Sequence, residues 1–515
     1  MKKGIVYFVG AGPGHPKLIT LRGMEVLAKS DVVVYDRLAS PLLLKYLKPG
    51  AQKVYVGKRP DRHTMKQEEI NQLLVKLALE GKTITRLKGG DPGVFGRVGE
   101  EAELLAQHGI EYEIVPGVTS ASAVPLYAGI PVTHRDYNST FCVITGHEKP
   151  EKLDSMICWD KLALASETLI FLMGVAKIRY IRDQLIKHGR DPDTPVALVR
   201  WGTRSEQETM TGTLATIAEQ VEAANFLPPA VIVVGKVVQL REKLLWYEKK
   251  PLFGVRVLIT RARTAKSRMA EAIEELGGEA VEFPVIAFRH PESRELIERR
   301  ETSLRQLKQC DWIFFTSVTG VEYFFDLLIE RNIDIRELYG KKIVAVGPQT
   351  AEALRKRGLL TESIPPEYTA PALVEHMRDQ WKPGQKALLP RGNLARETLP
   401  QALAQSGVEV FEMPVYETVM PEQVAADECV RMLEEGEIQV VTFTSSSTVQ
   451  NLVTLIERFG RNPVELLGRT LKASIGPITA ETLKQYGLKV DIMAREATVA
   501  SLVEAIAEHY RRGTR

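Results

Sequence analysis

The segment Thr83-Ile-Thr-Arg-Leu-Lys-Gly-Gly-Asp-Pro-Gly-Val-Phe-Gly96 runs from a short apolar stretch into a glycine-rich turn. Two adjacent glycines let a ligand lie against bare backbone, and Asp91 before Pro92 can hold a hydroxyl or a cationic centre. An ordinary turn is the alternative interpretation. Under either interpretation of the turn, the segment is predicted as a buried strand followed by a sharp turn. The neighbouring segments show the same alternation, which is typical of an α/β fold.

Short apolar runs alternate with amphipathic stretches on both sides of this segment. The runs are Ile5 to Val9, Asp31 to Tyr35, Thr83 to Leu87, Cys142 to Thr145, Thr168 to Met173 and Ala230 to Val234. Short runs without polar alternation are typical of parallel strands buried between helices. We therefore predict an α/β fold with largely parallel strands from Gly4 to Arg241.

The main domain boundary is expected after the charged stretch Arg241 to Lys250. Pro251 follows this stretch, and a new strand pattern starts at Val255.

The second half of the sequence repeats itself. Val344-Ala-Val-Gly-Pro-Gln-Thr-Ala-Glu352 returns as Ala473-Ser-Ile-Gly-Pro-Ile-Thr-Ala-Glu481. Two further pairs keep a similar spacing, namely Ile313 to Ser317 with Val441 to Ser445, and Val257 to Arg261 with Ala387 to Arg391. A repeat of about 130 residues is too long for a solenoid, so we predict two related α/β lobes.

Composition and charge exclude several classes of protein. The 515 residues carry 68 basic and 65 acidic side chains, a net charge of +3, which predicts no surface for nucleic acid. Cys142, Cys158, Cys310 and Cys429 lack CxxC spacing, which argues against a disulfide framework and against zinc or iron–sulfur sites. The nine histidines lack a spacing such as HExxH, so no metal is predicted. Without 18 consecutive apolar residues, we expect no membrane span or membrane partner, and a cytoplasmic protein.

Six motifs of the first half form an ordered set. They are Val9 to Gly14, Val34 to Leu38, Val56 to Lys58, Arg86 to Pro92, Ile130 to Asp136 and Ile144 to His147. Alone, Gly10 to Gly14 is an imperfect dinucleotide loop, because Pro13 removes an amide and His15 stands where a third glycine should be; a plain strand-to-helix turn is the alternative. Together the motifs resemble the uroporphyrinogen III C-methyltransferase family from Gly4 to about Arg241.

This resemblance implies a domain at residues 1–245 with two lobes, about 1–134 and 135–245. It also implies a homodimer, and S-adenosylmethionine held in the cleft between the lobes. Cofactor contacts are assigned to Pro13, Gly89, Gly90, Asp91, Val94, Thr119, Ser120, Met173 and Gly202.

The same resemblance assigns proton transfer to Asp36 and Lys58, and substrate binding to Arg37. The methyl acceptor is a pyrrole carbon, and after it attacks the sulfonium methyl a proton must leave the ring system, which a carboxylate can accept. Lys58 has two alternative roles, acid–base work and binding of substrate carboxylates. Asp36 has the alternative role of a strand-end cap.

Hydroxyl-rich strand ends and glycine turns of the second half form another ordered set. These are Leu258 to Arg261, Phe315 to Ser317, Ala345 to Gly347, Pro414 to Thr418, Phe443 to Ser446 and Ile475 to Pro477. They resemble uroporphyrinogen III synthase from about Phe253 to Arg515. The resemblance implies a domain at 253–515 with two lobes joined by a two-stranded connector, one lobe being inserted at about 284–413.

In this family pattern Tyr416 matches the proton donor to the leaving hydroxyl, and a buried packing role is its alternative. The residues assigned to substrate binding are Thr260, Arg261, Thr316, Ser317, Thr444, Ser445 and Thr479. Helix N-caps would show the same hydroxyl pattern.

The two resemblances predict one bifunctional enzyme. The second half would cyclise hydroxymethylbilane to uroporphyrinogen III, and the first half would methylate that product twice with S-adenosylmethionine to precorrin-2, for sirohaem or cobalamin. One alternative is methylation of a later corrin intermediate. Another is a methyltransferase whose second half is a non-catalytic tetrapyrrole sensor.

Overall fold

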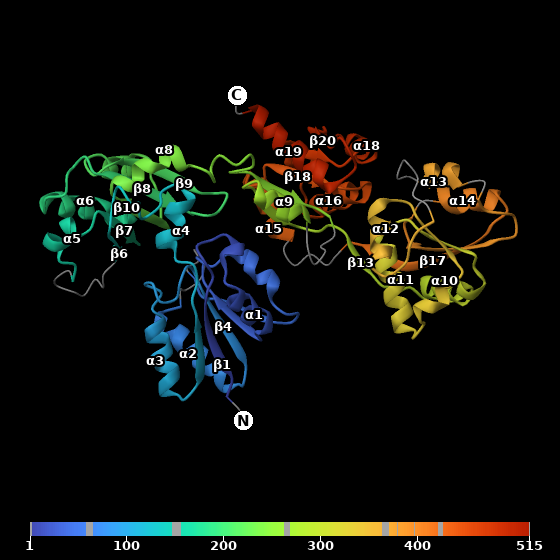
Figure 1. Cartoon of the computed structure of the whole chain (residues 1–515), viewed down its shortest axis with the longest axis horizontal. Coiled ribbons are helices and arrows are strands. Elements are labelled where there is room, and N and C mark those ends of the chain that lie inside the picture. The colour runs from blue at the N-terminus through green and yellow to red at the C-terminus, as the bar shows by residue number, and fades with distance from the viewer. Residues whose placement is uncertain are drawn as a thin grey trace. The chain divides into compact units, whose positions relative to one another are not determined.

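Four five-stranded sheets with helices packed on them form the chain in the computed structural model (Figure 1). The structure describes residues 3–57, 65–146, 156–261, 268–362, 370–377, 380–395, 397–420 and 426–513. The chain divides into two units, one formed by Met1–Val257, Ala270–Ala280 and Val503–Arg515, the other by Leu258–Met269 and Val281–Leu502. Strands and helices alternate throughout the described residues, so the predicted α/β class is confirmed.

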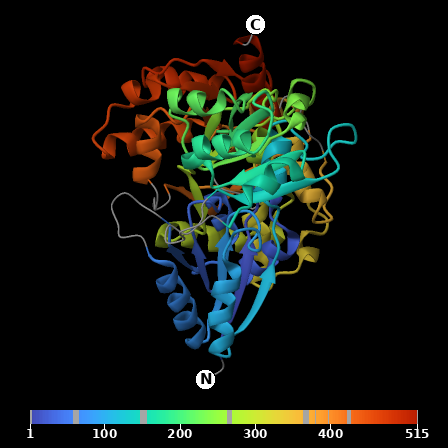
Figure 2. The same ribbon diagram turned by 90° about the vertical axis from the view of Figure 1, so that its left-hand side faces the viewer.

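The first sheet is parallel throughout and has helices on both faces. Its strands β1 (Ile5–Gly10), β2 (Val32–Tyr35), β3 (Gln52–Tyr55), β4 (Thr83–Lys88) and β5 (Glu111–Val115) have the order β3-β2-β4-β1-β5. α2 (Gln67–Leu79) and α3 (Val98–Gln107) cover one face and lie in front of the strands in Figure 2, whereas α1 (Leu21–Lys29) covers the other. Because both faces are covered, β1 and β2 are apolar almost without interruption, whereas the edge strands β3 and β5 carry exposed polar residues.

The second sheet is mixed, so the prediction of largely parallel strands is wrong for this lobe. Its strands β6 (Phe141–Thr145), β7 (Thr168–Leu172), β8 (Pro195–Arg200), β9 (Glu208–Thr213) and β10 (Ala230–Val234) have the order β6-β7-β10-β8-β9. β6 and β7 pair in parallel, whereas β7 with β10, β10 with β8, and β8 with β9 pair antiparallel. The short connection of residues 201–207 between β8 and β9 needs no crossover helix, which is the physical reason for their antiparallel pairing.

Helices cover both faces of this second sheet. α5 (Trp159–Ala165), α6 (Ile178–Lys187) and α7 (Ile217–Ala223) pack on one face, and α4 (Ser120–Tyr127) packs on the other. α4 thus belongs to the second sheet although it precedes residue 135, where the second lobe was expected to begin. The short helix α8 (Arg241–Leu244) follows the last strand.

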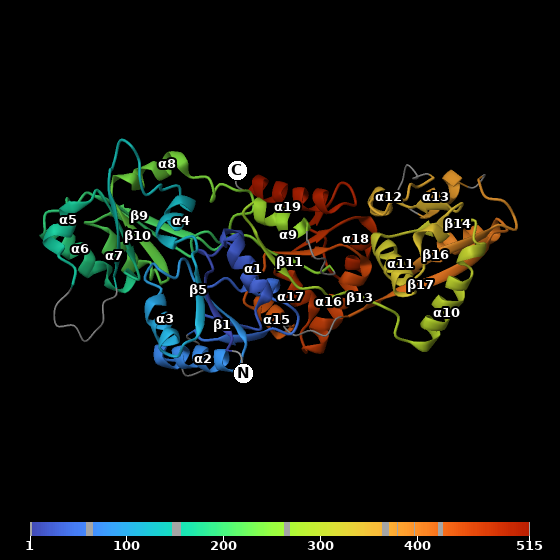
Figure 3. The same cartoon turned by 60° about the horizontal axis from the view of Figure 1, so that its bottom comes forward.

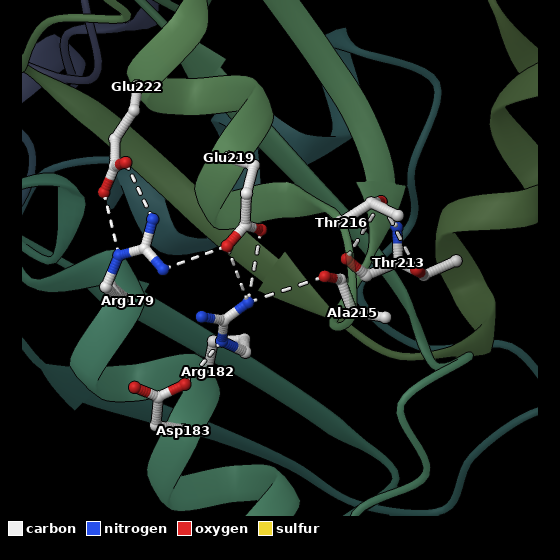
Figure 4. Close-up of polar contacts among 8 residues, drawn as sticks. All are labelled: Arg179, Arg182, Asp183, Thr213, Ala215, Thr216, Glu219 and Glu222. Atoms are coloured by element: carbon white, nitrogen blue, oxygen red, sulfur yellow. Dashed lines mark hydrogen bonds and ion pairs between the residues drawn. The ribbon is translucent and has the colours of Figure 1, made fainter.

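An exposed network of ion pairs joins α6 to α7 (Figure 4). Arg179 donates to Glu219 at 2.9 Å and to Glu222 at 2.7 Å, and Arg182 donates to Glu219 at 3.2 Å. Exposed pairs contribute little to stability and are screened by salt. The network therefore belongs to the solvated surface of the lobe, whose stability comes from the apolar side chains beneath it.

The third and fourth sheets come from the duplicated half of the sequence. The third has the order β12-β11-β18-β19-β20, and the fourth β13-β17-β16-β14-β15. The elements of the third are β11 (Arg256–Ile259), α9 (Arg268–Glu275), β12 (Glu279–Glu282), α15 (Ala426–Glu434), β18 (Val440–Phe443), α16 (Ser446–Arg458), α17 (Pro463–Gly468), β19 (Leu471–Ser474), α18 (Pro477–Gln485), β20 (Ile492–Met493) and α19 (Val499–Gly513). Those of the fourth are β13 (Ala287–Arg289), α10 (Arg294–Arg305), β14 (Trp312–Phe315), α11 (Val318–Glu330), β15 (Lys342–Ala345), α12 (Pro348–Arg355), α13 (Ala370–Met377), β16 (Lys386–Gly392), α14 (Thr398–Gln405) and β17 (Glu409–Val419).

The strand orders confirm the predicted duplication. The order β17-β16-β14-β15 in the fourth sheet corresponds to β12-β11-β18-β19 in the third, and the last two strands of each series pair in parallel. α11 and α12 follow β14 and β15 just as α16 and α18 follow β18 and β19. β13 and β17 form an antiparallel pair near the two ends of the segment expected as the inserted lobe. Figures 1 and 3 both place the fourth sheet between α10 with α11 on one side and α13 on the other.

Equivalent core positions of the two related lobes provide a test of this architecture. Phe315 ends β14 and Phe443 ends β18, and both side chains are fully buried. We predict that Phe315→Ala and Phe443→Ala each lower the free energy of unfolding by about 3–5 kcal/mol, because each removes a large core side chain. Hydrogen exchange should show faster opening in the lobe that carries the substitution.

Ile329 on α11 is 73% exposed and supplies the control. Ile329→Ala should change stability by less than about 0.5 kcal/mol. A large loss of stability in one phenylalanine variant and none in the other would contradict the equivalence of the two lobes.

Candidate functional site

A cleft of about 320 Å³ lies at the carboxyl ends of β1, β2, β4, β7 and β8. Ligands of α/β proteins bind at such strand ends, because the connecting loops converge there. The cleft is lined by Gly12, Pro13, Asp36, Leu38, Gln67, Arg86, Lys88, Gly89, Gly90, Val94, Phe95, Gly96, Arg97, Ser120, Val124, Leu172, Met173, Val199, Trp201, Gly202, Arg204, Pro229, Ala230 and Val231. This set makes the cleft the candidate site of the first half.

Glycine turns bring bare backbone to the cleft. Gly12 and Gly90 exchange backbone hydrogen bonds of 3.2 and 2.8 Å, which tie the loop after β1 to the loop after β4. A Cβ on Gly10 would stand only 2.5 Å from the Cα of Gly117. Gly90 has φ +68°, but a Cβ there would meet nothing closer than the Ser120 nitrogen at 3.5 Å. Position 10 therefore needs glycine because a side chain would clash with Gly117. Position 90 favours glycine because its φ is positive, and the space beside its Cα is free.

Asp91 joins two of the cleft loops. Its Oδ1 accepts a hydrogen bond from the Gly93 amide at 2.7 Å, and its Oδ2 accepts one from the Gly117 amide at 2.9 Å. Thr119 caps α4, and its Oγ1 accepts from the Ala121 amide at 3.3 Å. Asp91 and Thr119, both predicted as cofactor contacts, are not among the residues that line the cleft.

The structure brings the other seven predicted cofactor residues together. Pro13, Gly89, Gly90, Val94, Ser120, Met173 and Gly202 all line the cleft, and so does Asp36. Arg37 is exposed beside Asp36. Lys58 lies outside the described residues.

Left-handed backbone conformations gather around the same cleft. Phe95, Arg97, Met173 and Trp201 line it with φ of +54°, +59°, +57° and +46°, and Thr203 follows with φ +70°. Each such residue costs about 1–3 kcal/mol and persists only where its surroundings enforce it, a situation that is common at ligand sites. The sequence motifs did not reveal these conformations, since no glycine marks the five positions.

A buried charge network lies next to Asp36. Arg86 Nη2 donates to Asp36 Oδ2 at 3.1 Å, and Lys88 Nζ donates to Glu101 Oε1 at 2.7 Å. Gln67 Nε2 also donates to this Glu101 oxygen at 2.8 Å, and Arg86 Nε lies 3.6 Å from it. Burial lowers the pKa of Lys88 and repulsion from Arg86 lowers it further, whereas Glu101 raises it. Through Arg86 the network fixes the position of the Asp36 carboxylate.

Asp36 also caps its own loop, because its Oδ1 accepts from the Leu38 amide at 3.0 Å. The expected strand-end cap and the expected position in the cleft therefore occur together.

Sequence analysis assigned no role to Arg86, Lys88 or Glu101. A signal exists for the first two, because residues two apart on a strand point to the same face and two cations on a buried face require an acid. Glu101 has no such signal. Glu100 precedes it on the same helix, and only the packing of α3 buries the second of the two.

Trp201 lies against cations from both lobes. The Arg37 guanidinium carbon lies 5.1 Å from its ring centroid and that of Arg204 lies 4.6 Å from it, distances typical of cation–π contacts. Arg37 follows β2 of the first sheet, whereas Trp201 and Arg204 follow β8 of the second. The cleft is therefore rich in positive charge near Asp36.

In the second half, the structure places Tyr416 beside Ser317. The Tyr416 hydroxyl lies 3.5 Å from Ser317 Oγ, and its ring centroid lies 5.2 Å from that of Phe288 and 5.6 Å from that of Tyr323. A Cβ on Gly392 would stand 2.5 Å from the Tyr416 ring. Glycine at position 392 is thus needed for this position of the tyrosine.

Several predicted substrate hydroxyls serve the scaffold. Ser317 Oγ accepts from the Gly320 amide at 3.0 Å, and Ser445 Oγ accepts from the Thr448 amide at 3.4 Å, so both are helix N-caps. Thr260 is fully buried and donates to the Thr442 carbonyl at 2.6 Å. The two serines are half-buried at their strand ends, whereas the Thr260 hydroxyl is enclosed in the sheet.

The remaining predicted residues differ in accessibility. Thr316 is exposed, Thr444 is half-buried and Thr479 is buried in the first turn of α18. Burial lowers the pKa of Arg261, which also lies in a half-buried position.

Neither a metal cluster nor a membrane helix is found in the part of the chain that the structure describes. Among those residues, no group of three or more His, Cys, Asp or Glu side chains has the arrangement to hold a metal ion. In the same residues, no helix combines the length and the apolar character needed to cross a membrane.

Two protein-family models match separate halves of the chain. The family described as Tetrapyrrole (Corrin/Porphyrin) Methylases matches residues 5–218, and the family described as Uroporphyrinogen-III synthase HemD matches residues 267–504. Porphyrin biosynthesis protein HemD of Ruminiclostridium josui is 38% identical over 99% of this chain and 98% of its own length.

Two further similar proteins match the first half. Uroporphyrinogen-III C-methyltransferase of Priestia megaterium is 54% identical over 46% of this chain and 98% of its own length. The structure of uroporphyrin-III C-methyl transferase from Thermus thermophilus complexed with S-adenyl homocysteine is 39% identical, covers 46% of this chain and 100% of that chain, and gives a TM-score of 0.40. The chain therefore belongs to the tetrapyrrole methylase family through its first half and to the uroporphyrinogen-III synthase family through its second half.

Proposed function

We propose that the chain catalyses two consecutive steps of tetrapyrrole biosynthesis. The second half closes hydroxymethylbilane to uroporphyrinogen III with inversion of ring D and loss of water. The first half transfers two methyl groups from S-adenosylmethionine to uroporphyrinogen III and forms precorrin-2. The observation that carries the proposal is the single cleft that Asp36 shares with seven of the nine predicted cofactor residues. The family matches on the two halves support it.

The residues of the cleft fit a nucleoside-containing cofactor. A volume of about 320 Å³ lies within the range of small-molecule sites. Gly90 leaves free space beside its backbone, and Val94, Met173 and Val199 supply apolar surface. When bound, S-adenosylmethionine supplies a methyl group on a positively charged sulfur, which is the electrophile.

Asp36 accepts the proton that the tetrapyrrole loses when the new carbon–carbon bond forms. Its carboxylate is held from two sides, by the Leu38 amide and by Arg86, and so has a fixed direction in the cleft. Glu101 lies behind Arg86 and offsets the positive charge of Arg86 and Lys88. Lys58 retains both predicted roles, proton transfer and binding of substrate carboxylates.

Tyr416 donates a proton to the hydroxyl that leaves hydroxymethylbilane. Loss of water produces a cationic azafulvene, so this half needs to shape the chain and assist the departure more than to supply a nucleophile. Gly392 and Phe288 confine the tyrosine ring, and Ser317 lies beside its hydroxyl. This confinement supports a positioned hydroxyl over a residue that only fills space.

The proposal includes a cytoplasmic homodimer that forms through the first half. β5 is an edge strand of the first sheet, and Tyr112 and Ile114 on it are 40% and 42% exposed, which supports an apolar contact with a second copy. Light scattering of the purified chain measures the oligomeric state directly.

Precorrin-2, the product of the proposed methylation, serves sirohaem or cobalamin synthesis.

A coupled assay tests both activities in one chain. Hydroxymethylbilane alone should yield the type III isomer, and addition of S-adenosylmethionine should convert it to precorrin-2. Tyr416→Phe should slow the first step by about 10-fold or more, because the proton donor is lost, and leave methylation of supplied uroporphyrinogen III unchanged. Formation of only the type I isomer by the wild-type chain would instead favour a non-catalytic sensing module.

Asp36→Asn should lower kcat of methylation by about 10²- to 10⁴-fold, because the amide cannot accept the proton. Binding of S-adenosylhomocysteine, measured by calorimetry, and formation of uroporphyrinogen III should both stay at wild-type values. Asp160→Asn, on the exposed start of α5, is the matched control. A normal kcat in Asp36→Asn would remove Asp36 from the proposed chemistry.

Glu101→Gln should lower the free energy of unfolding by about 3–5 kcal/mol, because Lys88 then lacks its acid and Arg86 keeps only Asp36. Chemical denaturation measures the loss. The double variant Glu101→Leu with Lys88→Met should recover part of it, since one of these cations is removed together with the acid. Glu103→Gln, exposed on the same helix, should have almost no effect. A similar loss in this control would show that the loss in Glu101→Gln does not come from the buried charge network.

A further inference from the structure

Arg204 is a half-buried cation of the cleft that has no acidic partner in the described part of the chain. Arg86 and Arg97 also line the cleft, and each bonds a carboxylate, Arg86 that of Asp36 at 3.1 Å and Arg97 that of Glu100 at 3.0 Å. Within the described ranges, no hydrogen bond or ion pair links the Arg204 guanidinium to a carboxylate. Its Nε is buried and has no hydrogen-bond partner.

The charges around Arg204 leave this cation without full compensation. Burial lowers the pKa of Arg204, and repulsion from Arg256 and Arg37 lowers it further, whereas Glu279 raises it. Glu279 lies in residues 270–280, which belong to the same unit. Its Oε2 already accepts from Ser205 Oγ at 2.9 Å and from Arg256 Nε at 3.0 Å.

Contacts with neighbouring residues fix the position of the Arg204 side chain. Its guanidinium lies over the Trp201 ring at 4.6 Å, and a Cβ on Gly14 would stand 2.9 Å from its Cγ and Nε. Thr203, with φ +70°, is held by three hydrogen bonds. Its Oγ1 accepts from the His15 amide at 3.0 Å, its carbonyl accepts from Tyr247 at 3.3 Å, and its amide donates to Gln207 Oε1 at 2.9 Å. A side chain that the fold aims into a cleft in this way is prepared for a ligand.

We propose that Arg204 is a carboxylate-binding residue of the methyl-transfer site. This inference rests on the proposed function of the first half. A guanidinium whose Nε is buried without a hydrogen-bond partner is costly, and its planar fork matches a carboxylate with two parallel hydrogen bonds. Two carboxylate sources meet in the proposed reaction, the amino-acid end of S-adenosylmethionine and the acidic side chains of the tetrapyrrole.

Two binding measurements on the full chain separate these sources in Arg204→Met. If Arg204 binds the cofactor carboxylate, the Kd of S-adenosylhomocysteine measured by calorimetry should rise roughly 10- to 100-fold. If Arg204 binds the tetrapyrrole, the KM of uroporphyrinogen III should rise by a similar factor and that Kd should stay constant. Arg204→Lys keeps the charge but loses the fork, so a smaller rise is expected in the same constant.

The Tm of the chain without ligands separates ligand binding from a structural role. Removal of a half-buried cation that lacks an acidic partner in the described residues should leave the Tm of Arg204→Met unchanged or raised, whereas loss of a structural contact would lower it. Arg179→Gln, which removes an exposed cation of the same lobe, should change neither binding constant. If Arg204→Met does not fold, Arg204→Lys carries the same comparison.

The inference is overturned if Arg204→Met and Arg204→Lys keep both constants within about twofold of wild type. A wild-type chain that binds S-adenosylhomocysteine but does not methylate uroporphyrinogen III would overturn the proposed function instead. In that case the Kd of S-adenosylhomocysteine for Arg204→Met would still show whether Arg204 binds the carboxylate of the cofactor. A wild-type chain that neither binds nor methylates would overturn both.

Discussion

The close approach of two glycine turns is the constraint on which the first site depends. β1 lies between β4 and β5 in the parallel sheet, so the loops that follow the three strands leave it side by side. Gly12 and Gly90 can exchange two backbone hydrogen bonds there, and Gly10 can touch Gly117, because none of the four carries a side chain. These contacts fix the loop between β4 and α3. The same loop supplies Gly90 and Val94 to the cleft and carries Asp91, whose two oxygens bond it to itself and to the loop after β5.

The two buried sets of charges at this cleft have different physical characters. Arg86 and Lys88 are balanced by Asp36 and Glu101, so the network contains two cations and two anions and can exist without a ligand. Arg204 has no hydrogen bond or ion pair to a carboxylate in the described residues, and in our proposal a ligand carboxylate supplies the balance. A balanced network suits a fixed base such as Asp36, whereas an unbalanced cation suits a position that an anionic ligand occupies.

Sequence reasoning succeeded where local pattern decides structure. The apolar runs at β1, β2 and β4 are strands because helices cover both faces of the sheet, and the repeated Gly-Pro turns at 347–348 and 476–477 start equivalent helices in two lobes. It failed where tertiary contacts decide. β9 is polar and lies at a sheet edge, so no apolar run marks it. β10 is an apolar run like those of the parallel strands, yet it pairs antiparallel with both of its neighbours, which makes the second sheet mixed. Thr260 has the sequence pattern of a ligand hydroxyl, yet neighbouring strands enclose it.

The duplicated half shows why one lobe carries the proposed chemistry. Both lobes retain the scaffold of the repeat, since Ser317 and Ser445 cap equivalent helices. Two related segments are Glu282-Phe-Pro-Val-Ile286, at the end of β12, and Glu412-Met-Pro-Val-Tyr416, within β17. At the last position of the segment, one lobe has a buried isoleucine and the other has the tyrosine. Hydroxymethylbilane is a linear chain with one leaving hydroxyl, and such a substrate needs a proton donor at one place only. The repeat keeps its helix caps in both lobes but has a tyrosine at this position in one of them only, which fits the single proton donor proposed for Tyr416.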